Sequence, residues 1–460
     1  MSRYRVAKNH GQTAASEVGA VTRSLIGLTA AAAFALAVLF VTRELIAPSF
    51  SYQGYTSRDW DTWEIVRAAA ATAVFGLVAS VRSNRTASFA VGFLVATVAI
   101  PLLWIPVFYG ILDGAGVLQL HLATFFGFGI LWFFATLPGR PLRMLIVSEQ
   151  NYLWFIVAAV LAIFAVLVLF YGIRPAVFTF GEVYDQRDEY NESIGKVGRY
   201  LIGALTNALL PVLVVFGAGR KRVGVLAFGV LGFLLAYSMT GFKSVIVGLT
   251  LTVVAIIIIK RWPHSPSAWL VVLFGVVSFG YLIDRAMGTI TFSSILTRRA
   301  ITTSGINSSY FIDFFADAER YMLRHSFLSF LGESPYHLTP ARLIGSVYYQ
   351  SDTMAANANI LADGYANFGF AGALGACAVA GFCLWMYGKL TGHLPTVVSM
   401  PALVLLLVAW ANTAVFTSLV THGGFLLAIL VALMPWPEVR SLSSNTDGAR
   451  GEICFAKADD

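Results

Sequence analysis

Long apolar runs recur along almost the whole chain, and they constrain its fold more than any other feature. Roughly twelve runs approach the length of about 20 apolar residues that one helical membrane crossing requires. We expect spans at residues 24–46, 65–81, 88–108, 117–136, 152–171, 200–217, 223–239, 243–259, 267–283, 357–387, 400–416 and 421–435. The sequence therefore predicts an all-α polytopic membrane protein with about twelve transmembrane helices.

The composition supports a membrane location and excludes a soluble domain. Hydrophobic residues make up 58% of the 460 residues, only 12% are charged, and the mean hydropathy is +0.75. The net charge of +7 comes from Lys and Arg scattered through loops, not from a basic domain. We therefore expect no nucleic acid partner, and instead anionic membrane lipids or a phosphate-bearing substrate.

The three cysteines indicate neither a disulfide framework nor a metal site. Cys377 and Cys383 lie within one apolar run and Cys454 lies in the C-terminal tail, a spacing that matches no metal-ligand pattern. We expect no metal and no cofactor. The basic residues before position 24 resemble the start of a signal peptide, but the run that follows is long enough to span, which predicts an uncleaved first helix.

Basic residues in the short connections predict the orientation of the helices, because Lys and Arg accumulate on the cytoplasmic side. With alternating crossings, one side receives the basic N-terminus together with Arg82, Arg85, Arg140, Arg143, Arg220, Lys221, Arg222, Lys260, Arg261 and Lys389. Both termini are therefore expected in the cytoplasm, with an N-terminal tail at 1–23 and a disordered tail at 436–460. The transmembrane domain at 24–435 would include outer loops at 172–199 and 284–356.

The longest polar interruption, residues 284–367, follows the ninth span and is expected on the outer side. Within it, residues 310–330 have helical periodicity, with apolar residues on one side and charged residues on the other. This pattern predicts an amphipathic helix along the membrane surface. Its charges, including Arg320 and Arg324, have two interpretations, pairing within the helix or binding of substrate. His325 projects towards the apolar side, either against the membrane core or into a cavity.

Cations in three outer segments are candidate phosphate ligands. Arg187 lies among aromatic and acidic neighbours that suit a guanidinium held for a phosphate or a sugar, although a solvated loop is the simpler interpretation. Lys243 is at the N-terminus of an expected helix, where the helix dipole is already positive. A bound anion would offset both positive charges. Snorkelling of the lysine side chain to the membrane interface is the alternative. Arg298 and Arg299 are adjacent, and the pair has two interpretations. They are bidentate binding of a pyrophosphate and anchoring to lipid headgroups.

Polar residues form a stripe where the tenth span begins. If residues 355–370 begin a helix, Asn359, Asp363 and Asn367 fall at i, i+4 and i+8 on one side. Amides and a carboxylate at the end of a membrane helix are costly unless satisfied, so the stripe should face protein or a wet cavity. We expect it to hydrogen-bond sugar hydroxyls.

Several catalytic patterns are missing from the sequence. It contains no P-loop, no dinucleotide fingerprint and no His-Glu-x-x-His pattern, which leaves nucleotide hydrolysis and zinc proteolysis without support. Few ionisable residues fall within the spans, and this weakens the interpretation as a proton-coupled transporter.

Three segments carry a resemblance to a known family. They are Thr240-Gly-Phe-Lys-Ser244, Arg298-Arg299 and the Asn-rich stretch from Ala356 to Gly372, which contains Asp-Gly and then Phe-Gly-x-x-Gly. Together with the architecture of most of the chain, they resemble the bacterial oligosaccharide repeat-unit polymerases, which include the O-antigen polymerases. The resemblance implies a metal-independent membrane glycosyltransferase of the GT-C type in the bacterial cytoplasmic membrane, with an active site that faces the periplasm.

The resemblance also implies the substrates and partners. The donor would be a growing glycan on undecaprenyl diphosphate, and the acceptor a lipid-linked repeat unit. A chain-length regulator and a flippase are implied partners. For such substrates we expect the donor diphosphate to be bound by Arg187, Lys243, Arg298 and Arg299, and the acceptor diphosphate by Arg320, Arg324 or Arg342. The candidates for the general base are Asp363, His325 and His337, and the candidate sugar ligands are Tyr184, Asn357, Asn359 and Asn367.

Two other functions remain as alternatives. A related ligase would move finished glycan to another acceptor and deplete the lipid carrier, whereas a polymerase makes a ladder of lipid-linked chains. A transporter or flippase for lipid-linked sugars would need similar binding residues but would change no bond. The outer insertion of roughly 70 residues favours an enzyme, because alternating access does not require it.

Overall fold

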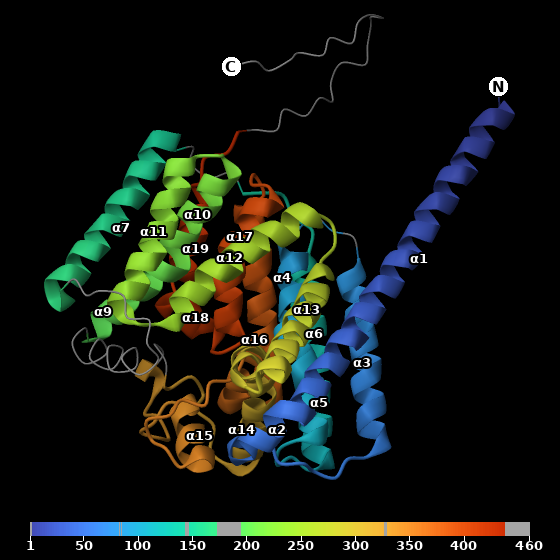
Figure 1. Ribbon diagram of the computed structural model, residues 1–460, viewed down its shortest axis with the longest axis vertical. Coiled ribbons are helices and arrows are strands. Elements are labelled where there is room, and N and C mark those ends of the chain that lie inside the picture. Colours follow the sequence, from blue (N-terminus) through green and yellow to red (C-terminus); the bar gives the residue numbers. More distant parts are fainter. Residues whose placement is uncertain are drawn as a thin grey trace, which may run out of the picture.

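The fold is built from helices that run between two opposite faces of the molecule (Figure 1). A computed structural model describes residues 2–81, 83, 85–142, 147–172, 195–325 and 329–437. No β-strand forms among these residues, and the only extended pairing in them is one isolated antiparallel bridge between Ser57 and Tyr109. The expected all-helical architecture is confirmed.

The helices follow the apolar runs. In the first half of the chain they are α1 (Ser2–Val41), α2 (Ala47–Phe50), α3 (Thr62–Ser80), α4 (Thr86–Leu94), α5 (Ile100–Phe108), α6 (Gly114–Thr136), α7 (Glu149–Tyr171), α9 (Gly195–Ala204) and α10 (Leu210–Gly219). In the second half they are α11 (Val223–Thr240), α12 (Lys243–Arg261), α13 (Ala268–Met287), α14 (Thr303–Asp317), α15 (Pro340–Tyr349), α16 (Ile360–Leu390), α17 (Thr396–Trp410), α18 (Val415–Thr421) and α19 (Gly424–Ala432). Single π-helical turns join α4 to α5 and α9 to α10 without breaking the helical path.

Ten helical stretches in the described chain are long and apolar enough to cross a membrane, and α18 with α19 adds an eleventh if this pair, bent by 65°, is one span. The apolar helix α17 has 15 residues, which gives a length of about 22 Å against a hydrocarbon thickness of about 30 Å. Each of the twelve expected spans therefore corresponds to a helix or a helix pair, but about ten are long enough for a full crossing.

The two faces of the helix array differ in what they carry. The described chain begins and ends at one face, whereas α14, α15 and their connections lie at the other (Figure 1). We call the first the basic face, because Arg85, Lys260 and Lys389 lie at helix ends there, and the second the loop face. α1 begins at Ser2, so this helix includes most of the segment expected as an N-terminal tail. The expected C-terminal tail lies almost entirely outside the described residues.

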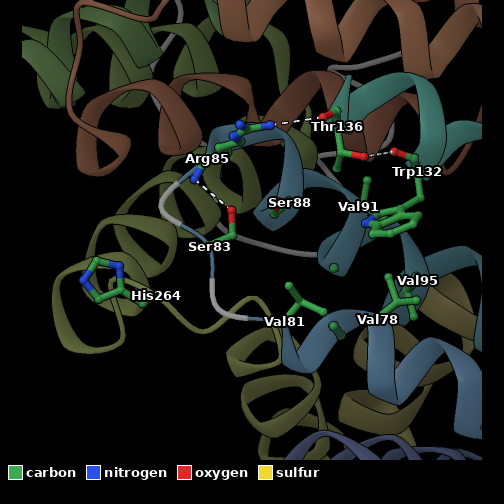
Figure 2. A pocket seen from close by; sticks show the side chains of 12 residues that line it. Val78, Val81, Ser83, Arg85, Ser88, Val91, Val95, Trp132, Thr136 and His264 are labelled. Carbon is green, nitrogen blue, oxygen red and sulfur yellow. Dashed lines mark hydrogen bonds between the residues drawn. The ribbon is translucent and has the colours of Figure 1, made fainter. Parts of the chain in front are cut away.

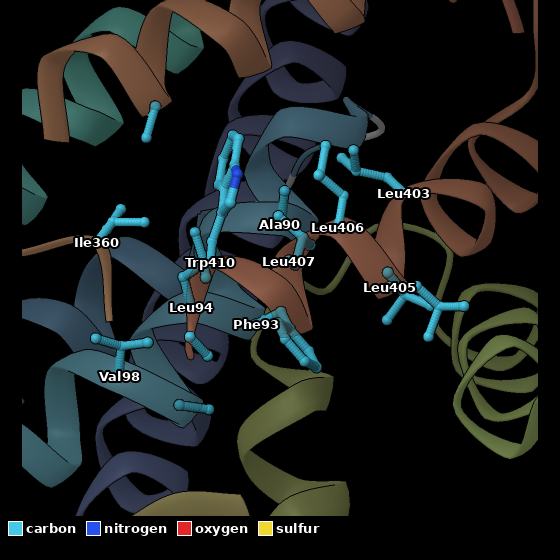
Figure 3. Close-up of a cluster of buried hydrophobic side chains, with 14 of the residues drawn as sticks. Ala90, Phe93, Leu94, Val98, Ile360, Leu403, Leu405, Leu406, Leu407 and Trp410 are labelled. Carbon is cyan, nitrogen blue, oxygen red and sulfur yellow. The ribbon is translucent and has the colours of Figure 1, made fainter. Parts of the chain in front are cut away.

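Two helices form the centre of the array. α4 and α17 are apolar around their whole circumference, and a helix of that kind is stable only when protein surrounds it. Figure 3 shows their side chains interleaved, with Phe93 and Leu94 beside Leu406, Leu407 and Trp410. This packing fixes the positions of the surrounding helices.

Small residues allow other helices to approach closely. Gly27 of α1 faces Gly76 of α3, and a Cβ at position 76 would lie only 2.8 Å from the carbonyl oxygen of Gly27. Glycine pairs of this kind are a common device in membrane helix packing, where burial of apolar surface does not drive association.

The expected amphipathic surface helix at 310–330 is wrong in its bounds and its position. α14 begins earlier and ends at Asp317, and nearly every residue from Ser304 to Ile312 is buried. It packs against α5 and α16, with Gly305 placed against Pro101 and Ile105. After α14 ends at Asp317, Tyr321 packs against Phe315 of α14 and against Tyr336. These ring contacts set the path of the chain beyond the helix.

Candidate functional site

The candidate site lies at a break inside α16. The helix is interrupted at Phe368 and Gly369, and Gly369 adopts a left-handed φ of +63°, which favours glycine. A break of this kind removes the helical partners of the preceding carbonyl groups. The carbonyl oxygens of Ala366 and Asn367 accept hydrogen bonds instead from the N–H groups of Tyr321 and Met322, at 3.1 and 3.3 Å.

The outer insertion is therefore fastened to the break. The Leu323 N–H donates to the side-chain oxygen of Asn367 at 2.8 Å. Both Met322 and Leu323 have positive φ angles, of 50° and 62°, which cost energy for residues with a Cβ. Three hydrogen bonds to Ala366 and Asn367 offset that cost, so residues 321–323 and the end of the first half of α16 form one structural unit.

Asp363 faces a cavity beside this unit. The cavity has a volume of 460 Å³ and its lining includes Leu323, Asn367, Phe368 and Val415. The amide nitrogen of Asn367 lies 3.4 Å from a carboxylate oxygen of Asp363 and also donates to its carbonyl oxygen at 2.8 Å. Within the described part of the chain, no arginine or lysine lines the cavity and no ion pair involves this carboxylate.

Asn367 therefore holds both the insertion and the carboxylate. Its side-chain oxygen accepts from the Leu323 N–H, and its side-chain nitrogen donates towards the Asp363 carboxylate. One amide therefore connects residues 321–323 of the insertion to the acidic group of the cavity. Of the stripe expected to face protein or a wet cavity, Asp363 and Asn367 both line this cavity. The expected hydrogen bonds to sugar hydroxyl groups stay a prediction.

Arg320 lies against the break itself. A Cβ at position 369 would be 2.8 Å from the guanidinium carbon of Arg320, so a larger residue there would displace the end of this side chain. The buried Nε of Arg320 has no hydrogen-bond partner among the described residues. Arg324 is more fully engaged, because its guanidinium pairs with Glu319 at 3.0 Å and donates to the Tyr321 carbonyl oxygen at 3.2 Å.

The two candidate histidines have different environments. His325 packs edge-on against Tyr321, with ring centroids 4.7 Å apart. Burial lowers the pKa of His325 to about 4, and its Nδ1 has no partner in the described chain. The imidazole is therefore neutral at pH 7 and has little affinity for a proton. His337 is exposed on the loop face.

Asn359 belongs to the framework. Its side-chain oxygen caps α16 by accepting from the N–H groups of Leu361 and Ala362, and its nitrogen donates to the hydroxyls of Ser304 and Ser308 at 2.8 and 2.9 Å. All its polar atoms are used, and the residue is fully buried. Only part of the expected stripe is therefore open to a ligand. Asn357 has an exposed side chain, and its carbonyl oxygen accepts from Asn307.

The adjacent residues Arg298 and Arg299 have different environments. Arg298 is 8% exposed, donates to Gln53 at 2.5 Å and to Ser294 at 3.0 Å, and lies 4.0 Å from the ring centroid of Phe50. These contacts fasten the insertion to the end of the first span, which leaves its guanidinium little freedom for a diphosphate. Arg299 is exposed.

The remaining expected cations are dispersed or undescribed. Arg342 is exposed on α15, and Lys243 is exposed at the first position of α12. Arg187 and Tyr184 lie outside the described residues, as does most of the expected loop at 172–199. The structure thus gathers Arg320, Arg324, His325, Asp363 and Asn367 around the break in α16 and places Arg298 in a separate contact.

A second, more polar cavity on the loop face escaped the sequence-based prediction. It has a volume of 680 Å³, and its polar lining comes from Arg199, Asn207, Ser244, Asn412 and His422. α18 borders both cavities, because its first residues line the one at Asp363 and its last residue lines this one. These polar residues come from distant parts of the sequence, and no single motif connects them.

Two structural carboxylates were also missed. Glu64 is 2% exposed and receives Arg58 at 2.6 and 3.2 Å. Asp284 accepts from the hydroxyl of Thr289 and from the N–H groups of Phe292 and Ser293, which closes the turn after α13. The spacing of Arg58 and Glu64 across a helix start was a usable signal, whereas the turn at Asp284 requires knowledge of its backbone path.

The described side chains do not form a group of three or more potential His, Cys, Asp or Glu metal ligands. Comparison of the chain with protein-family models, with curated proteins and with solved structures found no match.

Proposed function

We propose that this chain is a membrane glycosyltransferase that polymerises lipid-linked oligosaccharide repeat units on its loop face, which the distribution of basic residues predicts to be periplasmic. The observation that carries the proposal is the Asp363 carboxylate, which faces a cavity at a broken membrane helix without a cation partner in the described chain. A carboxylate that is not neutralised by a cation keeps its ability to accept a proton.

In the proposed reaction, a hydroxyl group of the incoming repeat unit attacks the anomeric carbon of the growing glycan. The bond from that carbon to the diphosphate oxygen breaks, a glycosidic bond forms, and undecaprenyl diphosphate leaves. Asp363 accepts the proton of the attacking hydroxyl. Asn367 is a positioning residue, because its amide holds the carboxylate from one side.

The leaving diphosphate gains negative charge as the glycosidic bond to it breaks, and a preorganised cation stabilises that charge. Arg320 fits this role best, since its Nε has no partner in the described chain and its guanidinium lies at the helix break. The exposed Arg299 is a candidate for the second lipid diphosphate. Arg298 fits poorly, because its donors are used by Gln53 and Ser294.

Asp363 is preferred over the histidines as the base. His325 has a pKa lowered to about 4 by burial, so it would release a proton readily and accept one poorly at neutral pH. The side chain of His337 is exposed and lies outside the cavity lining at Asp363.

The test is polymer synthesis by purified protein from lipid-linked repeat units. We expect Asp363→Asn to lower the rate by about 10²–10⁴-fold, while Asp317→Asn, an exposed carboxylate on the same face, keeps at least half the rate. Arg320→Gln should lower the rate by about 10²-fold, with Arg342→Gln as its exposed control. Wild-type chain growth by Asp363→Asn would eliminate Asp363 as the base.

A transporter for lipid-linked sugars is the second candidate. The break in α16 and the 65° bend between α18 and α19 border the two loop-face cavities, and discontinuous helices of this kind surround substrate sites in transporters. Polymer synthesis in detergent, where no second compartment exists, would exclude transport as the main activity. Product analysis separates the related ligase, because a ligase depletes the lipid carrier whereas a polymerase extends its glycan.

A further inference from the structure

A cationic cavity lies on the basic face, on the side opposite to Asp363. Its volume is 760 Å³, and its charged lining comes from Arg85, Lys260 and Lys389, with His264 beside them. No carboxylate lines it among the described residues. The sequence explains why, because the connections at 81–85, 137–148, 260–267 and 389–395 contain Lys and Arg but no Asp or Glu.

Two other arginines on the same face are paired with a carboxylate. Glu149 receives Arg220 at 2.6 Å and Arg222 at 3.1 Å, so these two arginines share a carboxylate. The tendency of Lys and Arg to gather on one side of a membrane explains which face carries them. It does not explain why three of them from different connections line one cavity without a carboxylate.

The cavity is also prepared for an anion by its walls. The ammonium of Lys389 lies 4.2 Å from the ring centroid of Trp385. The indole N–H of Trp385 is buried and has no hydrogen-bond acceptor in the described chain, although both residues line the cavity. A ligand that carries acceptor oxygens would satisfy this donor as well as the cations.

An apolar groove continues from the cationic cavity. A neighbouring pocket of 550 Å³ shares Arg85 and His264 with that cavity (Figure 2). Ser83 lies beside Arg85 at one end, and the apolar residues Val78, Val91, Val95 and Trp132 lie towards the other, with Thr136 next to Trp132.

The same four residues, Val78, Val91, Val95 and Trp132, also line a groove of 750 Å³. This groove is lined only by apolar residues and glycines, and it runs along α3, α4, α6 and α16. Its aromatic residues are Phe75, Phe125, Phe126, Phe128, Trp132, Phe133 and Phe134. The cationic cavity, the pocket of 550 Å³ and the apolar groove are therefore contiguous, because each shares lining residues with the next.

We propose that this composite site binds one anionic phospholipid, with its phosphate oxygens at Arg85, Lys260, Lys389 and the Trp385 indole, and with an acyl chain along the apolar groove. The sequence of polarity along the site matches an amphiphile with a negative head and a long hydrocarbon chain. Basic pockets between membrane helices select lipids with phosphate headgroups in this way. The site is independent of the proposed transfer reaction, because it lies on the other face.

The probe is cardiolipin, which carries two phosphates, added to delipidated protein in detergent and counted by native mass spectrometry against phosphatidylcholine. We expect wild-type protein to retain cardiolipin preferentially, and Lys260→Gln with Lys389→Gln to weaken this binding by about 10–30-fold, since each cation near phosphate contributes about 1 kcal/mol. Arg261→Gln is the matched control for Lys260→Gln, because Arg261 is adjacent in sequence but does not line the cavity.

A second pair of variants tests the groove without disturbing the headgroup site. A Cβ at Gly129 meets no atom within 4 Å, and the residue lines the groove, so Gly129→Phe should fill it and lower cardiolipin retention at least several-fold. Gly275→Phe is the control, since Gly275 is equally open but lies on α13, away from the groove.

Three results would overturn the proposal. If phosphatidylcholine were retained as well as cardiolipin, the site would not select anionic phospholipids, and the groove would be an ordinary lipid contact. An effect of Arg261→Gln as large as that of Lys260→Gln would indicate unspecific attraction to the face. Displacement of cardiolipin by free pyrophosphate, combined with an unaffected Gly129→Phe variant, would identify a site for a soluble anion.

Discussion

Glu64 and Asp363 are both carboxylates on membrane helices near the loop face, and they are held in opposite ways. Glu64 is almost completely buried and meets the Arg58 guanidinium at 2.6 Å, while Arg58 also donates to the carbonyl oxygen of Val107. Among the described residues, the Asp363 carboxylate has one amide nitrogen near it, at 3.4 Å, and it faces a cavity. The difference teaches that a charged group in this membrane protein serves the framework where it is paired and is available to a ligand where it is not.

Removal of each carboxylate gives the largest expected difference. Glu64→Ala leaves the Arg58 charge buried without its partner, so we expect a loss of about 3–5 kcal/mol in the free energy of unfolding. Asp363→Asn removes a charge that has no cation partner in the described chain, and the free energy of unfolding should change by less than about 1 kcal/mol. Thermal unfolding in detergent measures both. Equal losses for the two variants would contradict the comparison.

The same comparison applies to the two adjacent arginines. Arg298→Gln removes hydrogen bonds to Gln53 and Ser294 and the contact with Phe50, which should cost about 1–3 kcal/mol of stability. Arg299→Gln changes an exposed side chain and should stay within about 0.5 kcal/mol. Thermal unfolding of the two variants, prepared in parallel, gives the answer. A larger loss for Arg299→Gln would show that the exposed guanidinium holds the insertion.

His325 extends the comparison to pH, with a smaller expected effect. Burial lowers its pKa to about 4 in the folded protein, against an ordinary value near 6.5 in the unfolded chain. The unfolded chain therefore takes up the proton first, and stability that is present above pH 6.5 is lost as the pH falls towards 4. Between pH 7 and pH 5 we expect a loss on the order of 1 kcal/mol.

Hydrogen exchange of residues 319–325 measures the effect when each rate is divided by the intrinsic exchange rate at that pH, which gives a protection factor. His325→Gln provides the control, because the variant lacks the titrating group and should lose most of the pH dependence of protection. An equal fall in protection at pH 5 in both proteins would assign the pH dependence to other groups.

The sequence predicted the helices well and the insertion poorly, for a physical reason. An apolar run of 20 residues has one stable conformation in a membrane, so the spans and the i, i+4 relation of Asp363 to Asn367 follow from the chain alone. The path of the insertion depends on contacts between distant residues. Tyr321 bonds to the carbonyl of Ala366, and no periodicity within residues 310–330 reveals that α14 ends at Asp317.

Some residues of the candidate site were likewise predicted from local sequence, whereas others depend on contacts between distant residues. Asp363 was identified because its sequence neighbours define a stripe, whereas Arg320 was a candidate diphosphate ligand on an expected helix that does not extend to it. Its place at Gly369 requires both the left-handed glycine and the turn after α14. The polar cavity around Arg199 and His422 was missed because its members come together only through helix packing, whereas the pair of Arg58 and Glu64 was missed although its spacing was visible in the sequence.

The bonds between residues 321–323 and the break in α16 have a mechanical consequence. If this segment is lifted from the cavity, the carbonyl oxygens of Ala366 and Asn367 lose their donors at the same moment. An acceptor without a partner in a low-dielectric cavity costs several kcal/mol, so the segment behaves as a latch whose release is steep and not gradual. Access to Asp363 along this route is therefore an event with two states, closed and open, and a ligand that supplies two hydroxyl donors would hold it open.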